Sequence, residues 1–218
     1  MSPLLRVRKL LGRIRRRFQV DVFDVFARPV PVENEGADAP AAASDYTLRW
    51  GTIADVARCD PFHTELDERE RRLGARRLEL GHRVVIAFAD DDQPVFSMWV
   101  NPRNLNIPGL VKRRLAPDQW FIYKAYTSPE HRSRKLYQAG MRFVLAEMSK
   151  EGLRELVGYA HVKKEVSRKG LARLSFGAIG RMRHVNVPGW ARTFLSDELV
   201  RRFPEDVART GVLEGDAT

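Results

Sequence analysis

A basic loop between a strand and a helix is the part of the sequence whose residue types most clearly point to chemistry. It lies within YTSPEHRSRKLYQAGMRFVLA, residues 126–146, where an extended segment ends at a proline and an apolar-periodic helix follows the basic residues. The first backbone N–H groups of a helix lack partners within the helix and sit at the positive end of its dipole. His131, Arg132, Arg134 and Lys135 add positive charge there. The loop is therefore predicted to bind an anion, and we expect a ligand that carries phosphate.

A second candidate for chemistry is His161, which follows the predicted strand 156–160. The usual pKa range of histidine suits a general base. A single histidine at a strand end can equally be a simple hydrogen-bonding residue, and both interpretations stay open. The five histidines are widely scattered and no HxxxH or CxxC pair occurs, so we expect no metal site. A Walker loop, a GxGxxG dinucleotide motif and a GxSxG hydrolase elbow are also absent from the sequence.

Length and composition limit the class of protein. A chain of 218 residues with 44% hydrophobic content can bury one main core. Cys59 is the single cysteine, so no internal disulfide can form and a cytoplasmic location is expected. No apolar run approaches the roughly 20 residues that a bilayer-spanning helix needs.

The formal net charge of +10 is concentrated at the N-terminus. Residues 1–17 contain seven basic residues and no acidic one, and apolar residues recur among them at three- and four-residue steps. This pattern predicts a basic amphipathic helix, which could lie on an anionic membrane surface or dock its apolar stripe on the protein's own core. Nucleic-acid binding is not favoured, because stacking aromatic residues and a recognised nucleic-acid module are missing.

The remaining pattern predicts alternating strands and helices around these candidates. Predicted strands cover residues 20–30, 46–50, 82–89, 94–100, 120–127, 156–160 and 177–187, the last of them as one strand or two. Predicted helices cover residues 53–58, 65–80, 166–174 and 196–209, besides the helix after the basic loop. Residues 101–117 contain three prolines and several asparagines, which predicts a long loop or an irregular excursion. The order indicates a mixed α/β or α+β fold.

We expect four segments along the chain. Residues 1–30 form the basic helix and a strand, residues 31–45 a flexible linker, residues 46–190 the main domain, and residues 191–218 a last helix with a frayed tail.

The chain from about residue 46 to residue 187 resembles the GNAT superfamily of acyl-CoA-dependent N-acyltransferases. PEHRSRKLYQAGMRFV, residues 129–144, is similar to the strand, loop and helix that hold a pyrophosphate in this family. KKEVSRKGLARLSFGAIGRM, residues 163–182, is similar to a later signature that contacts coenzyme A. Lys135-Leu136-Tyr137 also partly resembles a Gly-Leu-Tyr run of bacterial members found with polysaccharide or lipid-linked sugar modification.

The resemblance implies a mostly antiparallel central sheet flanked by helices, and acetyl-CoA or another acyl-CoA as cosubstrate. It implies that the pyrophosphate lies at the basic loop and that the pantetheine arm pairs with the strand before it. The residues expected to contact the cofactor are Ala125, Tyr126, Thr127, Arg132, Ser133, Arg134, Lys135, Leu136, Tyr137, Lys164 and Ser167. His161 and Tyr126 are the candidates for catalysis, because the strand ends that carry them border the family's reaction site.

The sequence departs from the family's motifs at defined positions. Ser133, Lys135 and Tyr137 stand where the pyrophosphate loop has glycines or a small residue. Glycines allow a phosphate to approach the backbone closely. In the later signature Ser175 stands at the usual glycine, and Leu171 stands where many members carry a tyrosine that protonates the departing thiolate.

Three functional hypotheses follow. The first is an N-acyltransferase that acts on an amine of a small molecule, an amino sugar or a lipid-linked acceptor. The second is a degenerate member that binds coenzyme A or a partner without turnover. The third is an interaction module that residues 1–18 target to the inner face of a membrane.

Overall fold

The computed structural model describes residues 19–31, 45–58, 68–107 and 110–207. The predicted helix within residues 1–18 lies outside the described residues, and so does nearly all of the predicted linker. Every other predicted element falls wholly or partly within them.

An eight-stranded sheet forms the centre of the molecule, with the spatial order β10-β9-β1-β8-β7-β4-β3-β2. In chain order the strands are β1 (Gln19–Pro29), β2 (Thr47–Trp50), β3 (Arg83–Phe88), β4 (Pro94–Asn101), β7 (Gln119–Thr127), β8 (Glu155–His161), β9 (Gly177–Val187) and β10 (Trp190–Leu195). Neighbouring strands run antiparallel except for β7 and β8, which run parallel. The expectation of a mixed, mostly antiparallel sheet is confirmed.

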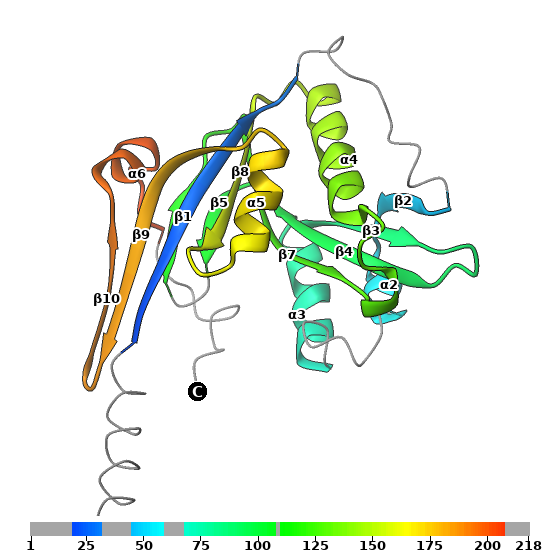
Figure 1. Cartoon of the computed structure of the whole chain (residues 1–218), viewed down its shortest axis with the longest axis horizontal. Helices are drawn as coiled ribbons and strands as arrows, with labels where there is room; N and C mark the ends of the chain where they lie inside the picture. The colour runs from blue at the N-terminus through cyan, green and yellow to red at the C-terminus, as the bar shows by residue number, and fades with distance from the viewer. Residues whose placement is uncertain (1–18, 32–44, 59–67, 108–109, 208–218) are drawn as a thin grey trace, which may run out of the picture.

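The strand near the N-terminus is an interior strand of this sheet. β1 pairs with β8 from Phe23 opposite His161 to Pro29 opposite Glu155, and its other edge pairs with β9. Residues 20–30 were expected to precede the main domain, but their strand is part of its central sheet. Figure 1 shows β1 crossing the molecule between β9 and β8.

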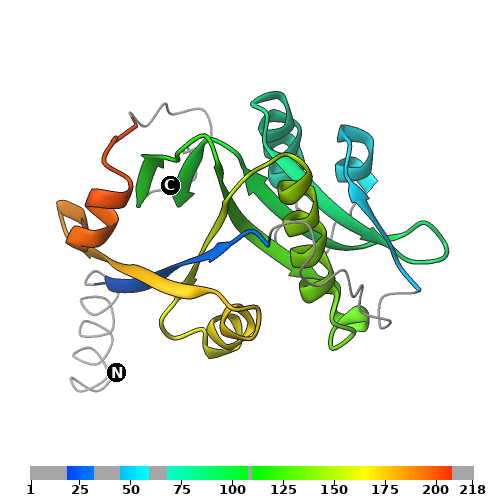
Figure 2. The same cartoon turned by 90° about the horizontal axis from the view of Figure 1, so that it is seen from above.

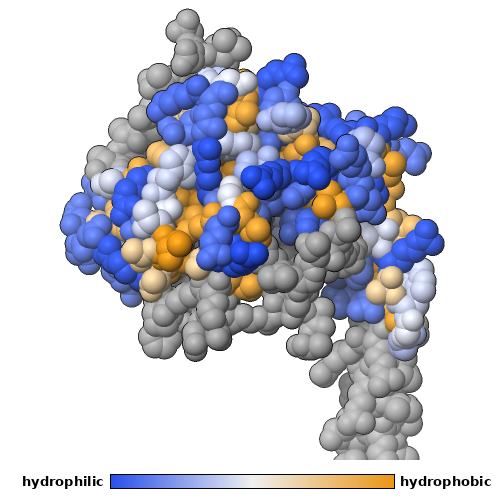
Figure 3. All heavy atoms as spheres, turned by 180° about the vertical axis from the view of Figure 1, so that it is seen from behind, coloured by the Kyte–Doolittle hydropathy of each residue, from blue (hydrophilic) through white to orange (hydrophobic). Residues whose placement is uncertain are grey.

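Helices cover the two faces of the sheet and bury two apolar clusters. α4 (Leu136–Lys150) and α5 (Glu165–Arg173) lie on one face, and the first cluster contains side chains of both helices. α2 (Ile53–Arg58), α3 (Glu68–Glu79) and α6 (Asp197–Arg202) contribute to the second cluster, on the opposite face. Figure 2 shows this layering from above, and Figure 3 shows hydrophobic residues between hydrophilic ones on the side seen from behind.

The sequences of the central strands are continuously apolar because both faces of these strands are buried. In β3, Val85 and Ala87 belong to the first cluster, whereas Val84 and Ile86 belong to the second. Successive side chains of a strand point to opposite faces, so each cluster takes every second residue.

The prediction of a long loop over residues 101–117 is wrong. β5 (Asn104–Ile107) and β6 (Val111–Arg114) pair as a separate antiparallel hairpin. Leu105, Ile107 and Val111 are buried in the second cluster, and this burial stabilises a segment that its asparagines and prolines made look irregular. β10 lies beyond the last predicted strand, and α6 ends at Arg202 rather than at residue 209.

Candidate functional site

The two parallel strands at the centre of the sheet separate partway along their length. β7 and β8 pair only at three positions, from Gln119 opposite Glu155 to Phe121 opposite Val157. Beyond this point β7 stays paired with β4 and β8 stays paired with β1, so each strand follows a different neighbour. The ends of β7 and β8 therefore diverge, with α4 and α5 on the near side in Figure 1.

A β-bulge marks the diverging part of β7. The register with β4 shifts between Ser97, which faces Tyr126, and Trp99, which faces Tyr123. Lys124 lies within the shift and has a left-handed backbone, with a φ of 47°. Bulges bend a strand and redirect its side chains, and they are frequent beside active sites. The strand residues expected to pair with a pantetheine arm lie here: Ala125 is exposed, and Tyr126 and Thr127 are half-buried.

The loop after β7 has the backbone shape of an anion site. A short 3₁₀ turn, η2 (Pro129–His131), leads to Ser133 and Lys135, which have φ angles of 64° and 60°. No side chain caps the N-terminus of α4. Within the described residues, no acceptor pairs with the backbone N–H groups of residues 133–138. Successive N–H groups in such a mixed-handed turn form a concavity that binds anions, and the dipole of α4 reinforces it.

The basic side chains of the loop do not all remain available for a ligand. The Nδ1 atom of His131 lies 3.0 Å from the hydroxyl of Tyr46. The Nε of Arg132 donates to the carbonyl oxygen of Thr127 at 3.3 Å, which leaves its outer nitrogens directed away from that bond. Arg134 and Lys135 are exposed. Arg132, Arg134 and Lys135 therefore place three exposed cationic side chains in the loop that carries the open N–H groups.

Two predicted cofactor residues point their side chains into the protein. Leu136 is only 2% exposed and packs in the first cluster, so its backbone alone can contact a ligand. Tyr137 packs against the same cluster, and its ring lies beside Gly170 of α5. Burial raises the pKa of the Tyr137 hydroxyl, which keeps the group protonated. Neither side chain obstructs the N–H concavity with a bulky exposed group.

The second motif forms α5 and its caps. Lys164 is the exposed residue at the N-terminal cap, and Ser167 is exposed on the first turn. At the other end Ser175 has a φ of 59°, and Phe176 and Ser175 donate to the carbonyls of Leu171 and Ala172. These two bonds are those of a Schellman motif, whose left-handed residue is usually glycine.

Three sequence departures thus preserve the backbone that glycine would supply. Ser133, Lys135 and Ser175 replace glycines of the two motifs, and each adopts a φ near 60°. The departure at Leu171 does change the chemistry. Leu171 is 2% exposed within the first cluster, so α5 offers no hydroxyl at that position.

His161 uses both of its ring nitrogens within the protein. Its Nδ1 accepts the backbone N–H of Lys163 at 3.0 Å, and its Nε2 lies 3.2 Å from the Oδ1 of Asp21. The first contact assigns the proton to Nε2, which then donates to Asp21. The lone pair that a general base needs is therefore occupied, and the geometry favours a positioning role for His161.

A pair of side chains that the sequence interpretation did not select lies beside the point of divergence. The Nδ1 of His82 is 2.6 Å from the hydroxyl of Tyr123, which is two residues beyond Phe121 on β7. Burial lowers the pKa of His82 to about 4. The nearby charges of Arg77, Arg103 and Lys112 act in the same direction.

At neutral pH the Tyr123 hydroxyl therefore shares a hydrogen bond with an uncharged His82, and the tautomer of the ring sets which group donates. Tyr123 also stacks on Phe121, with ring centroids 5.9 Å apart and planes at 4°. His82 and Tyr123 are 41 positions apart, so no local sequence pattern could have paired them.

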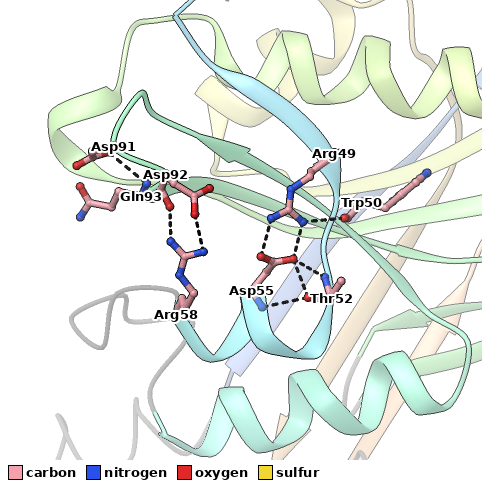
Figure 4. Close-up of polar contacts among 8 residues, drawn as sticks. All are labelled: Arg49, Trp50, Thr52, Asp55, Arg58, Asp91, Asp92 and Gln93. Carbon is pink, nitrogen blue, oxygen red and sulfur yellow. Dashed lines mark hydrogen bonds and ion pairs between the residues drawn. The ribbon is translucent and has the colours of Figure 1, made fainter.

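A separate polar cluster fixes the corner between β2 and α2 (Figure 4). The Nη1 and Nη2 atoms of Arg49 donate to the two carboxylate oxygens of Asp55 at 2.6 and 2.7 Å. Thr52 donates to the same carboxylate through its backbone and its hydroxyl, and Asp55 returns a backbone bond to that hydroxyl. Bonding to Arg49 holds the pKa of the Asp55 carboxyl well below its usual range. The contacts form a capping box that stabilises α2.

The described residues contain no group of three His, Cys, Asp or Glu side chains that could hold a metal ion. Among them, no helix has the length and apolar character that a bilayer crossing requires.

Comparison with known proteins places this geometry in a known fold. No protein-family model matches the sequence, and no curated protein matches it either. A tandem GNAT protein from the clavulanic acid biosynthesis pathway is similar in structure, with a TM-score of 0.52 and 14% identity over 81% of this chain. A functionally unknown conserved protein from Staphylococcus epidermidis gives a TM-score of 0.51 and 14% identity over 86% of this chain and 69% of its own.

A Drosophila protein gives a TM-score of 0.51 and 13% identity over 86% of this chain. The chain spans 54% of the tandem GNAT protein and 58% of the Drosophila protein. The chain has the fold of the GNAT acyltransferases.

Proposed function

We propose that the protein is an acyl-CoA-dependent N-acyltransferase. The observation that carries this proposal is the row of backbone N–H groups at residues 133–138, which lack acceptors within the described residues and lie at the N-terminus of α4. An anionic diphosphate matches this concavity in charge and in hydrogen-bonding capacity. Arg132, Arg134 and Lys135 would add charge-assisted bonds to its oxygens.

The diverging end of β7 would hold the rest of the same ligand. The pantetheine arm contains two amides, and the backbone of Ala125, Tyr126 and Thr127 would pair with them along the strand. Lys164 and Ser167 at the start of α5 would contact the cofactor from the other side. The bound acyl-CoA supplies the thioester, and the protein supplies its orientation.

The acceptor side of the reaction would lie over the face that carries Tyr123 and His82. An amine must lose a proton to attack a thioester, and the developing oxyanion needs a hydrogen-bond donor. The His82–Tyr123 pair contains a donor and an acceptor within 2.6 Å of each other. Tyr126 remains a candidate on the diverging strand, and His161 would position Asp21 and the end of β8. Amines of small molecules, amino sugars and lipid-linked acceptors all fit this proposal.

A protein that binds coenzyme A without turnover is the alternative, and two observations favour it. Leu171 offers no hydroxyl at the position of the commonest general acid, and the lone pair of His161 is occupied. Release of free thiol from acetyl-CoA in the presence of a panel of amines separates the two functions. Amine-dependent release supports the transferase, whereas binding without release for any amine supports the alternative.

The predicted contact of residues 1–18 with an anionic membrane, and a cytoplasmic location at its inner face, remain predictions. They would place a lipid-linked acceptor beside the enzyme.

A further inference from the structure

The outer three strands of the sheet form a ribbon with two distinct faces. Residues directly opposite each other in antiparallel strands point to the same face. Val22 faces Arg183, which faces Phe194 on β10, and the next rung is Val20, Val185 and Arg192. Val187 faces Trp190 at the tip. We call the face that these eight side chains share the ribbon face.

The ribbon face exposes large apolar side chains to solvent. Val20 is 52% exposed, Trp190 is 47% exposed and Phe194 is 44% exposed. The rings of Trp190 and Phe194 are 6.3 Å apart, so they form one continuous aromatic patch. Contiguous exposed apolar surface on a soluble domain marks an interaction site.

The opposite face of the same ribbon is covered at its inner end. Met182 is 1% exposed and lies in the second core cluster with Leu199 of α6, and Leu195 packs against that cluster. In Figure 1 the outer half of the ribbon extends away from α5 and α4. Trp190 and Phe194 therefore lie on the face of the ribbon that carries its large exposed apolar side chains, whereas the outer rung of the opposite face consists of the small or polar residues Gln19, Asn186 and Ala191.

Positive charge accompanies the apolar patch. Arg183 and Arg192 are exposed on the ribbon face, and the guanidinium of Arg192 lies 5.4 Å from the centre of the Phe194 ring. Within the described residues no carboxylate forms an ion pair with either arginine. Asp24 is the one acidic residue of these three strands on this face, and it is 4% exposed.

Asp24 adds no negative charge to the open surface. Its two oxygens pair with Arg181 at 2.7 Å and with Arg168 of α5 at 3.1 Å. Two arginines therefore accompany one buried carboxylate, and the surface beside the aromatic patch keeps a net positive charge.

The sequence that precedes β1 is also basic and apolar. β1 begins at Gln19, directly after a segment of 18 residues that contains seven basic residues and no acidic one. Val20, the second residue of β1, belongs to the ribbon face. The basic and apolar sequence of residues 1–18 therefore leads directly into the strand that begins the ribbon face.

We propose that the ribbon face rests on an anionic lipid surface. Trp190 and Phe194 would lie at the level of the headgroups, where an aromatic ring with an apolar body is favoured, and Arg183 and Arg192 would contact anionic headgroups. Bases could stack on Trp190 and Phe194, but four of the eight side chains of the face are valines, and burying these aliphatic side chains favours a lipid surface over a nucleic acid. Docking in this manner would set the orientation of the whole sheet relative to the membrane.

Co-sedimentation of the full chain with vesicles tests this surface directly. Vesicles of phosphatidylcholine and phosphatidylglycerol in equal parts are compared with vesicles of phosphatidylcholine alone. Arg183→Glu with Arg192→Glu should weaken partitioning to the anionic vesicles by at least about thirtyfold, since each basic residue near the surface contributes about 1 kcal/mol, or roughly fivefold. Arg173→Glu with Arg201→Glu, on α5 and α6, gives the same change in net charge away from the ribbon face and should weaken it much less.

Fluorescence of Trp190 provides an independent readout. Its emission should shift to the blue and be quenched by brominated phosphatidylglycerol, and Trp190→Phe should remove most of that change. Thermal unfolding of each variant verifies that the fold is retained. Equal partitioning of the ribbon and control variants would overturn the proposal, as would an unquenched Trp190 on bound vesicles. Binding to DNA that the ribbon variants abolish, with unchanged binding to vesicles, would assign the face to nucleic acid instead.

Discussion

Ser133 and Lys135 flank Arg134 with the same left-handed backbone, at φ angles of 64° and 60°. Both residues stand where the pyrophosphate loop of GNAT acyltransferases has glycine, and both keep the conformation for which glycine is the usual choice. The loop thus keeps its shape, but its backbone is strained at two exposed residues that are not glycine.

The first prediction concerns this strain. Lys135→Gly should raise the free energy of unfolding by about 0.5–1 kcal/mol, because relief of the left-handed backbone is worth roughly 1–2 kcal/mol and glycine loses about half of that to chain entropy. Chemical denaturation measures the change. Gly152→Ser, at a φ of 69° after α4, is the matched reverse variant and should destabilise by a similar amount. A loss of stability on Lys135→Gly would show that the lysine side chain contributes a contact that offsets the strain.

The second prediction concerns Ser175 and separates stability from binding. Ser175→Gly should stabilise the Schellman motif of α5 by about 0.5–1 kcal/mol. Affinity for coenzyme A should stay the same, because the change lies at the far end of the helix from Lys164. Denaturation and calorimetric titration of the same preparation test both statements. A large change in affinity would mean that the C-terminus of α5 takes part in binding.

The third prediction concerns the pH dependence of His82. Its pKa of about 4 lies below the ordinary value of 6.5, so the unfolded chain binds the proton more readily between these two values. Stability should fall as the pH is lowered from 6.5 to 4, by at most about 3 kcal/mol for this group. Chemical shifts of the His82 ring follow the titration. A midpoint near pH 6.5 would contradict the buried, neutral state.

Tyr123→Phe tests the partner of that histidine. Loss of the hydroxyl should cost about 1 kcal/mol of stability and should leave the fold intact. If the pair also serves the acceptor, amine-dependent thiol release should fall while affinity for coenzyme A is retained. Unchanged turnover would limit the pair to a structural role.

The fourth prediction concerns Asp55, whose pKa is lowered chiefly by its bonds to Arg49. Because the folded pKa lies below the unfolded one, the contribution to stability is present at neutral pH and is lost as the pH falls below about 4. Asp55→Asn should cost about 2 kcal/mol at pH 7, less than for a fully buried pair because the Arg49 side chain is 42% exposed. The difference between variant and wild type should shrink at acidic pH. A difference that stays constant would assign the effect to packing.

The sequence predicted the parts of the fold whose patterns are local. The apolar runs of β3, β4 and β7 and the helix after the basic loop are confirmed because each depends on neighbouring residues. The hairpin at Asn104 and Arg114 was missed because its stability comes from distant side chains that bury Leu105 and Ile107. The interior position of β1 could not be predicted, since strand order in a sheet is set by long-range packing.

The candidate site shows the same division. Residue types and spacing predicted the basic loop and the start of its helix. They could not predict the left-handed backbone angles at Ser133 and Lys135, because neither residue type prefers this conformation. The contact between His82 and Tyr123 joins an end of β3 to the middle of β7 and has no signature along the chain. The contact of His161 Nε2 with Asp21 likewise depends on β1, whereas the bond from the backbone N–H of Lys163 to Nδ1 is local.

The fifth prediction concerns Arg132, whose Nε is held by the carbonyl of Thr127. Arg132→Ala should weaken coenzyme A binding by roughly 1.5–3 kcal/mol, the range for a charge-assisted hydrogen bond. Arg201→Ala on α6 is the control, because it removes the same charge far from the loop. Equal affinities for the two variants would place the pyrophosphate elsewhere.

An NMR titration of the ¹⁵N-labelled protein with coenzyme A tests whether the loop before α4 holds the pyrophosphate. The largest amide shifts should occur at residues 133–138, because these N–H groups gain acceptors on binding, with smaller shifts at Ala125 and Thr127. Pantetheine, which lacks the pyrophosphate, should leave residues 133–138 almost unchanged. Absence of shifts at millimolar coenzyme A, or shifts confined to other parts of the chain, would show that residues 133–138 are not the pyrophosphate site.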